Sequence, residues 1–421
     1  MSLQTDWLAG IDPSWGIRRP KSLFSERRQP SQPDDIHLTP SQSLGVLPQS
    51  EYMKVTGTKV VLNLTGADNM KHVEPDDFVI HLRSFQGGIE HSRYAGKVSN
   101  AYTVFAPLPE VEPRFFRWVL KSQGFIQELN ATTEQLRDGQ SIKFEQFSRI
   151  GLPFPPLVEQ RRIADFLDNQ VARIDGLQER RRTQMDGLAS IVQQECDDAF
   201  VLPNGKLGPP PVRAARFLSV LPGFSFPSEC YSDDDTDVRL LRGVNVGVGR
   251  LRWDEVVYWP KSRAAEVSAF GLRSGDIVLG MDRPWIGAGL RVARLRDEDL
   301  PCFLLQRVAK LQLSAHVHPD FVVWAYRSSS FKASTEINLT GLSVPHLSGE
   351  QILNHELPVL SLSDQFALAK RLTELEVGVA GISVALRRSI DWLTEYKRSL
   401  ITAAVTGEFD VSAASGRGVP A

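Results

Sequence analysis

The sequence has few of the features that mark disulfide-rich, metal-binding or membrane proteins. Its three cysteines, at positions 196, 230 and 302, are too few and too scattered for a disulfide framework or a cysteine-based zinc site. No run approaches the roughly 18 apolar residues of a membrane span. The first residues lack the basic and apolar regions of a secretory signal. We therefore expect a soluble, cytoplasmic protein without a membrane contact.

An excess of positive charge is also missing. The formal net charge is −2, and residues 1–155 carry 17 Lys and Arg against 17 Asp and Glu. A protein of this composition does not bind nucleic acid through general basicity. Any DNA binding has to come from a local arrangement of charge.

Catalytic signatures are absent as well. The sequence contains no G-x-x-x-x-G-K-[ST], no H-E-x-x-H and no Asp/Asn-Pro-Pro-aromatic motif. His316 and His318 stand two residues apart, a spacing more typical of surface residues than of metal ligands. We expect no catalytic residue, no metal site and no cofactor in this chain.

What the sequence does contain is an internal repeat, with an offset between 199 and 206 residues. Five pairs of segments follow one another in the same order in both halves, which chance does not readily produce. The pairs are Asp77–Ile80 with Asp276–Leu279, Pro113–Trp118 with Pro319–Trp324, Phe125 with Phe331, Leu152–Pro153 with Leu357–Pro358, and Glu159–Gln160 with Asp364–Gln365.

Each half ends in a long helical pattern, with apolar residues about 3.5 positions apart and charges between them. The first pattern comprises Ile163, Leu167, Val171, Ile174, Leu177, Met185, Leu188 and Val192. The second comprises Leu368, Leu372, Leu375, Val379, Ile382, Leu386, Ile390, Leu393 and Leu400. Since such a pattern requires a partner helix, we expect the two helices, each about 30 to 40 residues long, to pair with each other.

The globular parts are expected to be mixed α/β, because short β-branched runs such as 59–62 and 78–80 alternate with turns and with amphipathic helices over 115–129 and 319–332. The predicted fold class is therefore two similar α/β domains separated by two long antiparallel coiled-coil helices, with an internal pseudo-twofold repeat. The predicted boundaries are 1–155 for the first domain, 156–200 for the first helix, 201–358 for the second domain, 359–407 for the second helix and 408–421 for a C-terminal tail.

Two segments resemble a known family. Leu152–Asp168, which reads LPFPPLVEQRRIADFLD and continues to Leu177, and Tyr396–Val411, which reads YKRSLITAAVTGEFDV, are similar to characteristic segments of the specificity subunits of type I restriction–modification enzymes. The second half has Leu360–Phe366 in place of the proline-rich entry of the first helix. This departure bears on whether the two helices bind partners equally well.

The resemblance implies two target-recognition domains, each reading one half of a split sequence in double-stranded DNA. It also implies long helices that set the gap between the half-sites and bind two adenine methyltransferase subunits, with a motor-nuclease restriction subunit as a further partner. S-adenosylmethionine, ATP and Mg²⁺ would belong to the partner subunits. Two alternatives remain open, namely a restriction–methylation fusion enzyme with unrecognised motifs and a coiled-coil scaffold that does not read DNA.

Candidate DNA-contacting residues come from three pairs of polar loops that recur in the repeat. Gln and Asn can pair bidentately with adenine and Arg with guanine, whereas any one of these residues taken alone is equally well a plain polar loop residue. The first half contributes Thr39, Ser41, Gln42, Arg83, Gln86, Arg137, Gln140 and Ser141. The second half contributes Arg242, Asn245, Arg283, Trp285, Asn338, Thr340 and Ser343.

Candidate partner-binding residues are arginines that flank the apolar positions of the two helical patterns. They would leave charged surface beside the helix–helix contact. They are Arg161, Arg162, Arg180, Arg181, Arg182, Arg387 and Arg388.

Overall fold

The structure is a computed structural model, and it describes residues 6–58, 70–81, 88–131, 142–200, 210–287, 289–336 and 345–411. The chain divides into two compact units. Unit 1 comprises Met1–Arg181 and Arg387–Ala421, and unit 2 comprises Arg182–Leu386. Each long helix begins in one unit and ends in the other, so both units contain a part of each helix.

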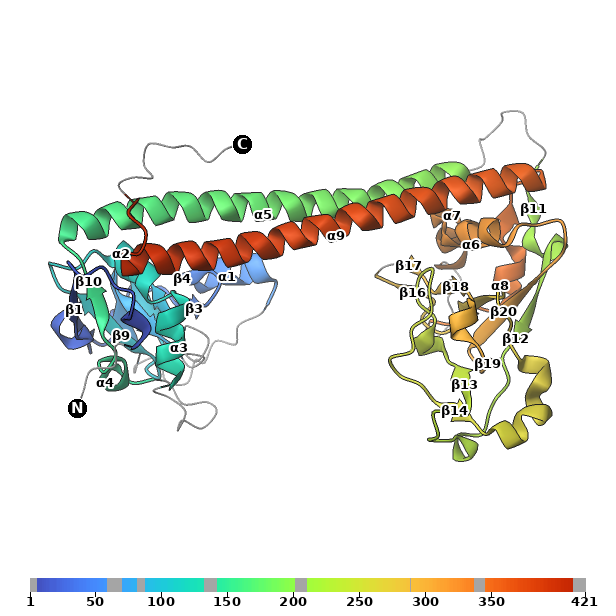
Figure 1. Cartoon of the computed structure of the whole chain (residues 1–421), viewed down its shortest axis with the longest axis horizontal. Coiled ribbons are helices and arrows are strands. Elements are labelled where there is room, and N and C mark those ends of the chain that lie inside the picture. The colour runs from blue at the N-terminus through green and yellow to red at the C-terminus, as the bar shows by residue number, and fades with distance from the viewer. Residues whose placement is uncertain are drawn as a thin grey trace. The chain divides into compact units, whose positions relative to one another are not determined.

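Unit 1 contains most of the elements drawn in blue and cyan in Figure 1. Its strands are β1 (Gly16–Arg18), β2 (Phe24–Arg27), β3 (Leu38–Ser41), β4 (Gly45–Pro48), β5 (Lys71–Val73), β6 (Phe78–Ile80), β7 (Ile89–His91), β8 (Gly96–Val98), β9 (Thr103–Pro107) and β10 (Leu152–Phe154). Its shorter helices are α1 (Gln49–Thr56), α2 (Pro113–Val119), α3 (Gln123–Ala131) and α4 (Phe144–Phe147).

Unit 2 repeats this plan with a longer middle section. Its strands are β11 (Val212–Arg213), β12 (Leu218–Pro222), β13 (Val238–Leu241), β14 (Tyr258–Trp259), β15 (Ile277–Gly280), β16 (Trp285–Ile286), β17 (Gly289–Leu290), β18 (Val292–Arg294), β19 (Cys302–Leu304), β20 (Val308–Leu313) and β21 (Glu356–Leu357). Its shorter helices are α6 (Pro319–Arg327), α7 (Ser329–Glu336) and α8 (Gly349–Asn354), and 3-10 turns include η5 (Ala214–Arg216) and η7 (Gly243–Asn245).

The central sheets of the two units have the same topology. The strand order is β2-β9-β6-β7 in unit 1 and β12-β20-β15-β18 in unit 2, and every neighbouring pair is antiparallel. A two-stranded ribbon, β1-β10 or β11-β21, joins each sheet to its long helix. The predicted mixed α/β class and internal repeat are confirmed by this correspondence.

The two predicted amphipathic helices are each divided into two. The segment 115–129 falls in α2 and α3, and 319–332 falls in α6 and α7. A serine stands at each break, where the hydroxyls of Ser122 and Ser328 donate to the carbonyls of Val119 and Ala325. A serine hydroxyl that satisfies a terminal carbonyl in this way competes with helix continuation, and the apolar spacing could not reveal it.

The long helices are α5 (Leu157–Phe200) and α9 (Leu362–Thr406), with 44 and 45 residues. In unit 1 they run antiparallel, because Asp175 accepts from Lys397 at 2.7 Å and Gln178 donates to Thr394 at 2.7 Å. The predicted helix pair is confirmed, and both helices exceed the predicted 30 to 40 residues.

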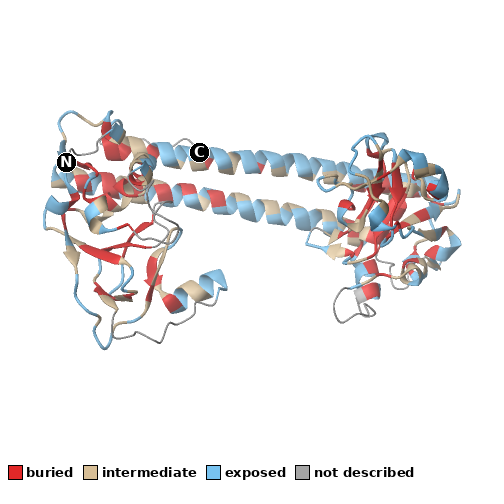
Figure 2. Cartoon of the chain, turned by 90° about the horizontal axis from the view of Figure 1, so that it is seen from below, coloured by how far each residue is buried: buried red, intermediate tan, exposed pale blue. Residues whose placement is uncertain are grey.

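The apolar seam is less continuous than the sequence suggested. Leu167 and Leu372 are fully buried at the helix ends, whereas Leu177 is 39% and Ile382 is 51% exposed. Figure 2 shows the same contrast, with buried red residues concentrated in the sheets and helix ends, and extensive pale blue along both long helices. The seam is therefore interrupted at these two positions, whereas Ile174, Leu386 and Leu393 are 5%, 9% and 8% exposed.

A buried glutamine fixes the start of each long helix. Gln160 Oε1 accepts the backbone N–H of Glu112 at 2.8 Å, and its Nε2 donates to the carbonyl of Pro155 at 2.9 Å. Gln365 does the same in unit 2, accepting from the N–H of His318 at 2.8 Å and donating to the carbonyl of Leu360 at 3.0 Å. The side chains of Gln160 and Gln365 are 0% and 3% exposed.

A tryptophan makes a second equivalent contact about two turns further along each helix. The indole N–H of Trp118 donates to Asp168 at 2.7 Å, and that of Trp324 donates to Thr373 at 3.1 Å. The matched residues of the repeat are therefore those that attach each globular part to the beginning of its own long helix.

Across the described ranges, no helix combines the length and apolar character needed to cross a bilayer.

Candidate nucleic-acid interface

The first predicted loop of unit 1 is the tip of a β-hairpin. Thr39 and Ser41 lie on β3, and Gln42 begins the turn to β4. All three side chains are half-buried. The turn closes at Gly45, whose φ of +74° favours glycine. The hairpin can present polar side chains at a fixed position, as a base-contacting loop requires.

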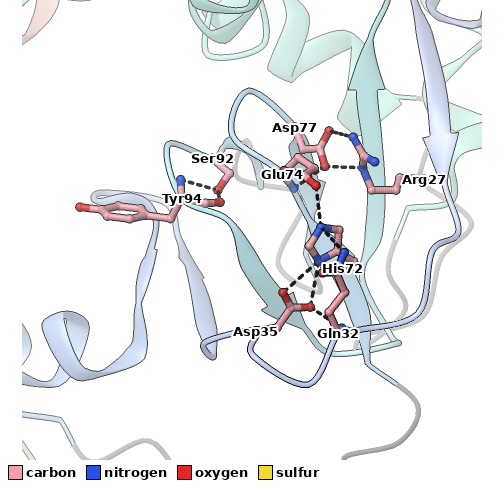
Figure 3. Close-up of polar contacts among 8 residues, drawn as sticks. All are labelled: Arg27, Gln32, Asp35, His72, Glu74, Asp77, Ser92 and Tyr94. Carbon is pink, nitrogen blue, oxygen red and sulfur yellow. Dashed lines mark hydrogen bonds and ion pairs between the residues drawn. The ribbon is translucent and has the colours of Figure 1, made fainter.

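A cluster of polar residues anchors the chain segment that leads into this hairpin (Figure 3). His72 is 3% exposed and lies between two carboxylates, with Nδ1 2.8 Å from Asp35 and Nε2 2.8 Å from Glu74. Burial alone would lower the pKa of His72, but the hydrogen bonds to Asp35 and Glu74 outweigh burial and raise it above the usual 6.5. Asp35 also accepts the N–H of Gln32 at 2.7 Å, so the cluster holds the turn just before β3.

The same panel shows the ion pair of Arg27 with Asp77, in which Arg27 Nε lies 2.6 Å from the carboxylate. Asp77 also accepts the N–H of Glu74 at 2.8 Å. Burial raises the pKa of Asp77, and the hydrogen bonds from Arg27 and from the Glu74 backbone oppose this shift. In unit 2 the matching Asp276 accepts the N–H of Arg273 and pairs with Lys310 at 2.6 Å. This repeated aspartate closes the turn before the central strand and is structural.

A cavity of about 790 Å³ lies in unit 1 beside the hairpin, between β7, α2 and the two long helices. Most of its cations have acidic partners. Lys121 pairs with Glu90, Lys397 with Asp175 and Arg398 with Glu395. Arg93 is exposed at the end of β7 and, within the described residues, has no acidic partner. Sequence reasoning missed Arg93, which only the fold brings next to the hairpin.

In unit 2 the structure removes Asn245 from the candidate set. Asn245 is 1% exposed, and its Oδ1 accepts the N–H of Arg242 at 3.0 Å. Its Nδ2 donates to the carbonyls of Arg252 and Glu255 at 2.9 and 2.8 Å. The side-chain amide of Asn245, which would pair with adenine, is therefore already hydrogen-bonded within its own loop. The side chain of Arg242 is held there too, donating to the carbonyl of Glu255 at 3.1 Å.

Trp285 also packs inward. Its ring centroid lies 5.9 Å from that of Phe331, and the ammonium of Lys332 lies 5.9 Å from the same indole ring. The side chain packs against the hydrophobic core of unit 2. Its partly buried position on β16 fits a core-edge residue better than the base-contacting role predicted for it.

Arg283 remains a strong candidate. It is exposed three residues after the end of β15, and its backbone N–H donates to the carbonyl of Pro345 at 2.8 Å. Arg307 and His346, which the sequence did not suggest, lie close by. Both contact Asp282, at 3.6 Å from Arg307 Nη1 and 2.7 Å from His346 Nδ1. These residues are far apart in sequence and belong to no local motif, so only the fold could assemble them.

The remaining candidate DNA-contacting residues lie outside the described residues and stay predictions. They are Arg83, Gln86, Arg137, Gln140, Ser141, Asn338, Thr340 and Ser343.

The candidate partner-binding arginines all lie on α5 and α9. Arg161 and Arg162 are exposed but have acidic neighbours, at 3.4 Å from Glu112 and 2.7 Å from Glu159. Arg181 is half-buried, whereas Arg180, Arg182, Arg387 and Arg388 are exposed. Of these, Arg180, Arg387 and Arg388 have no acidic partner among the described residues, so they can meet an acidic partner surface without first breaking an internal ion pair.

Among the described residues, no group of three or more His, Cys, Asp or Glu side chains is arranged to hold a metal ion. The backbone N–H of His318 donates to Gln365, so this histidine belongs to the attachment of α9.

Comparison with known proteins agrees with the architecture. Residues 42–184 match the family model described as "Type I restriction modification DNA specificity domain". The chain is 25% identical over 277 residues to the type I restriction enzyme MjaVIII specificity subunit of Methanocaldococcus jannaschii, which is 63% of each protein. It is 32% identical over 163 residues to the EcoAI specificity subunit of Escherichia coli, which is 39% of this chain and 27% of that protein. The matched regions thus span less than two thirds of the length of these relatives.

The fold also resembles a solved chain from a study of complex assembly and conformational transition in the type I restriction–modification system. The TM-score is 0.75 at 15% identity, and the match covers 95% of this chain and all of that chain. The architecture and the sequence comparisons agree. The two central sheets share one topology, an equivalent buried glutamine anchors each long helix, and a family model matches part of the chain. Over part of its sequence and in its fold, the chain is similar to the specificity subunits of type I restriction–modification enzymes.

Proposed function

We propose that this chain is the DNA-recognition subunit of a type I restriction–modification complex, and that each unit reads one half of a bipartite sequence in double-stranded DNA. The observation that carries the proposal is the structural repeat. The two central sheets have the same strand order, and each globular part is attached to its long helix through an equivalent buried glutamine, Gln160 or Gln365. Duplicated readers suit a target made of two separate half-sites.

The long helices would serve as spacer and partner surface. Helices of 44 and 45 residues extend about 66 Å at 1.5 Å per residue. Exposed arginines along them would meet two adenine methyltransferase subunits, and a motor-nuclease restriction subunit would join the same complex. In this proposal the chain itself is not catalytic. S-adenosylmethionine, ATP and Mg²⁺ would bind the partner subunits.

Purified components test the proposal. We expect the chain alone to transfer no labelled methyl group to DNA and its methyltransferase partner alone to transfer little, whereas the reconstituted complex methylates one defined sequence. Transfer by the pure chain would support the fusion-enzyme alternative. A complex that forms but shows no sequence preference would support the scaffold alternative.

A further inference from the structure

Three chain segments of unit 2 meet next to Asp282. They are the end of β15, the turn between β19 and β20, and the segment that precedes α8. The backbone N–H of Met281 donates to the carbonyl of Arg307 at 2.9 Å, and that of Leu347 donates to the carbonyl of Met281 at 2.8 Å. With the bond from Arg283 to Pro345, these contacts fix Asp282, Arg307 and His346 relative to one another.

The backbone at this junction is strained at two arginines. Arg283 has a φ of +43° and Arg307 a φ of +69°. In the described parts of the chain only three residues other than glycine have positive φ, and two of them meet here. Glycine adopts this conformation without strain, so an arginine at such a position costs stability. Backbone strain of this kind concentrates at functional sites, which suggests that the two side chains are used.

The electrostatics of the junction favour an anion. Asp282 faces Arg307 and His346, and its backbone carbonyl accepts from Arg291 at 3.3 Å. Burial lowers the pKa of Arg291, the nearby Arg252 lowers it further, and Asp282 only partly compensates. One carboxylate therefore lies near the guanidinium groups of both Arg307 and Arg291, and a further negative group would be stabilised there.

Arg307 is the residue best placed to bind that group. Its side chain is 60% exposed, and its Nη1 is 3.6 Å from Asp282, too far for a full hydrogen bond. Within the described residues its guanidinium donates no hydrogen bond, so its donors remain available. Asp282 is close enough to orient Arg307 without neutralising it.

We propose that Arg307, oriented by Asp282 beside His346, binds one phosphate of the DNA backbone and thereby positions Arg283 over the bases. A guanidinium group matches the geometry of a phosphate through two parallel hydrogen bonds, and phosphate contacts set the register of base-reading side chains. The inference rests on the proposed DNA-reading function. It adds that the two arginines have different roles: Arg307 positions the domain on the DNA backbone, and Arg283 contacts the bases.

The test uses the reconstituted complex with its methyltransferase partner and two duplexes of equal length, one with the motif found by methylation mapping and one without it. Binding is measured between 50 and 200 mM salt. Arg307→Gly is the informative variant, because glycine relieves the positive φ and loss of folding is not expected. Arg307→Lys keeps the positive charge but cannot make the two parallel hydrogen bonds of a guanidinium. Arg216→Ala is the control, because it removes an exposed arginine of η5, which precedes the edge strand β12.

We expect Arg307→Gly to weaken binding to both duplexes, and to the motif duplex at least as strongly because Arg283 also loses its positioning. The slope of log K against log salt should become shallower by about 0.9, the value for one phosphate contact. Arg307→Lys should keep the slope. Arg283→Gly should weaken binding only to the motif duplex, by roughly 10- to 100-fold, and Arg216→Ala should resemble the wild type. An unchanged slope for Arg307→Gly, or a loss confined to the motif duplex, would overturn the inference. A wild-type complex that binds both duplexes equally would instead overturn the proposed function.

Discussion

Replacing Gln160 by leucine should destabilise unit 1 and leave unit 2 unchanged. Leucine has a similar volume but leaves the backbone N–H of Glu112 and the buried carbonyl of Pro155 without the partners they have at 2.8 and 2.9 Å. Each buried polar group left unpaired costs about 1–3 kcal/mol. After some relaxation we expect the free energy of unfolding of unit 1 to fall by about 2–4 kcal/mol.

Hydrogen exchange followed by mass spectrometry separates the two units within the intact chain. Since about 1.4 kcal/mol corresponds to a factor of ten, the protection of the slowest amides of β6 and β9 should fall roughly 30- to 1,000-fold. The slowest amides of β15 and β20 should be unaffected. Gln365→Leu should produce the opposite pattern, and the double variant should combine both losses because the two sites share no partner.

Gln170→Leu is the matched control, because Gln170 lies on the same helix, is half-buried and makes no hydrogen bond within the described residues. Its effect should stay within about 0.5 kcal/mol. If Gln160→Leu behaved like this control, or if it reduced protection equally in both units, the glutamine would not be the anchor that joins each globular part to its helix.

Three further predictions concern pH, partners and spacing. The raised pKa of His72 means that its contribution to stability is complete below pH 6.5 and is lost as the pH rises through the folded pKa. The difference in urea-unfolding free energy between wild type and His72→Gln should therefore shrink as the pH increases from 6. A difference that stays constant with pH would refute the assignment. Reversing Arg180, Arg387 and Arg388 to Glu should reduce co-purification of the methyltransferase, by about 0.5–1 kcal/mol per exposed charge, while circular dichroism stays unchanged; undiminished complex formation would exclude these residues from the contact. Inserting four residues into each long helix should lengthen the gap of the methylated motif without altering its bases, and a change of bases at constant gap would contradict the spacer role.

The architecture was predictable because it depends on repeated segments and on local apolar spacing, both of which are visible in the sequence. The paired segments around Trp118 and Trp324 and the paired Gln160 and Gln365 are the residues that hold each long helix, so a similarity visible in the sequence reflected one contact made twice. The apolar spacing likewise predicted the two helices. It overstated the seam at Ile382, because heptad spacing does not specify how closely two helices pack midway along their length.

The candidate DNA-contacting residues were less predictable, because loop composition does not tell whether a polar side chain points outward. Asn245 has the residue type of an adenine reader, yet its amide is consumed by three bonds within its own loop. Arg307 and His346 lie 24 and 63 residues from Arg283 and meet it only through the pairing of β15 with β20 and the bond to Pro345. Contacts between residues so far apart in sequence follow from the strand topology, and they produce no regular residue spacing that could be recognised in the sequence.

Mapping of methylated adenines across a genome tests the central claim most directly, in cells that express the methyltransferase partner with and without this chain. We expect methylation that depends on the chain and falls on a split motif, two short defined segments separated by a gap of fixed length. Exchanging unit 2 for that of a related chain should replace one segment and keep the other. Chain-independent methylation, or one continuous motif altered throughout by the exchange, would contradict two independent readers.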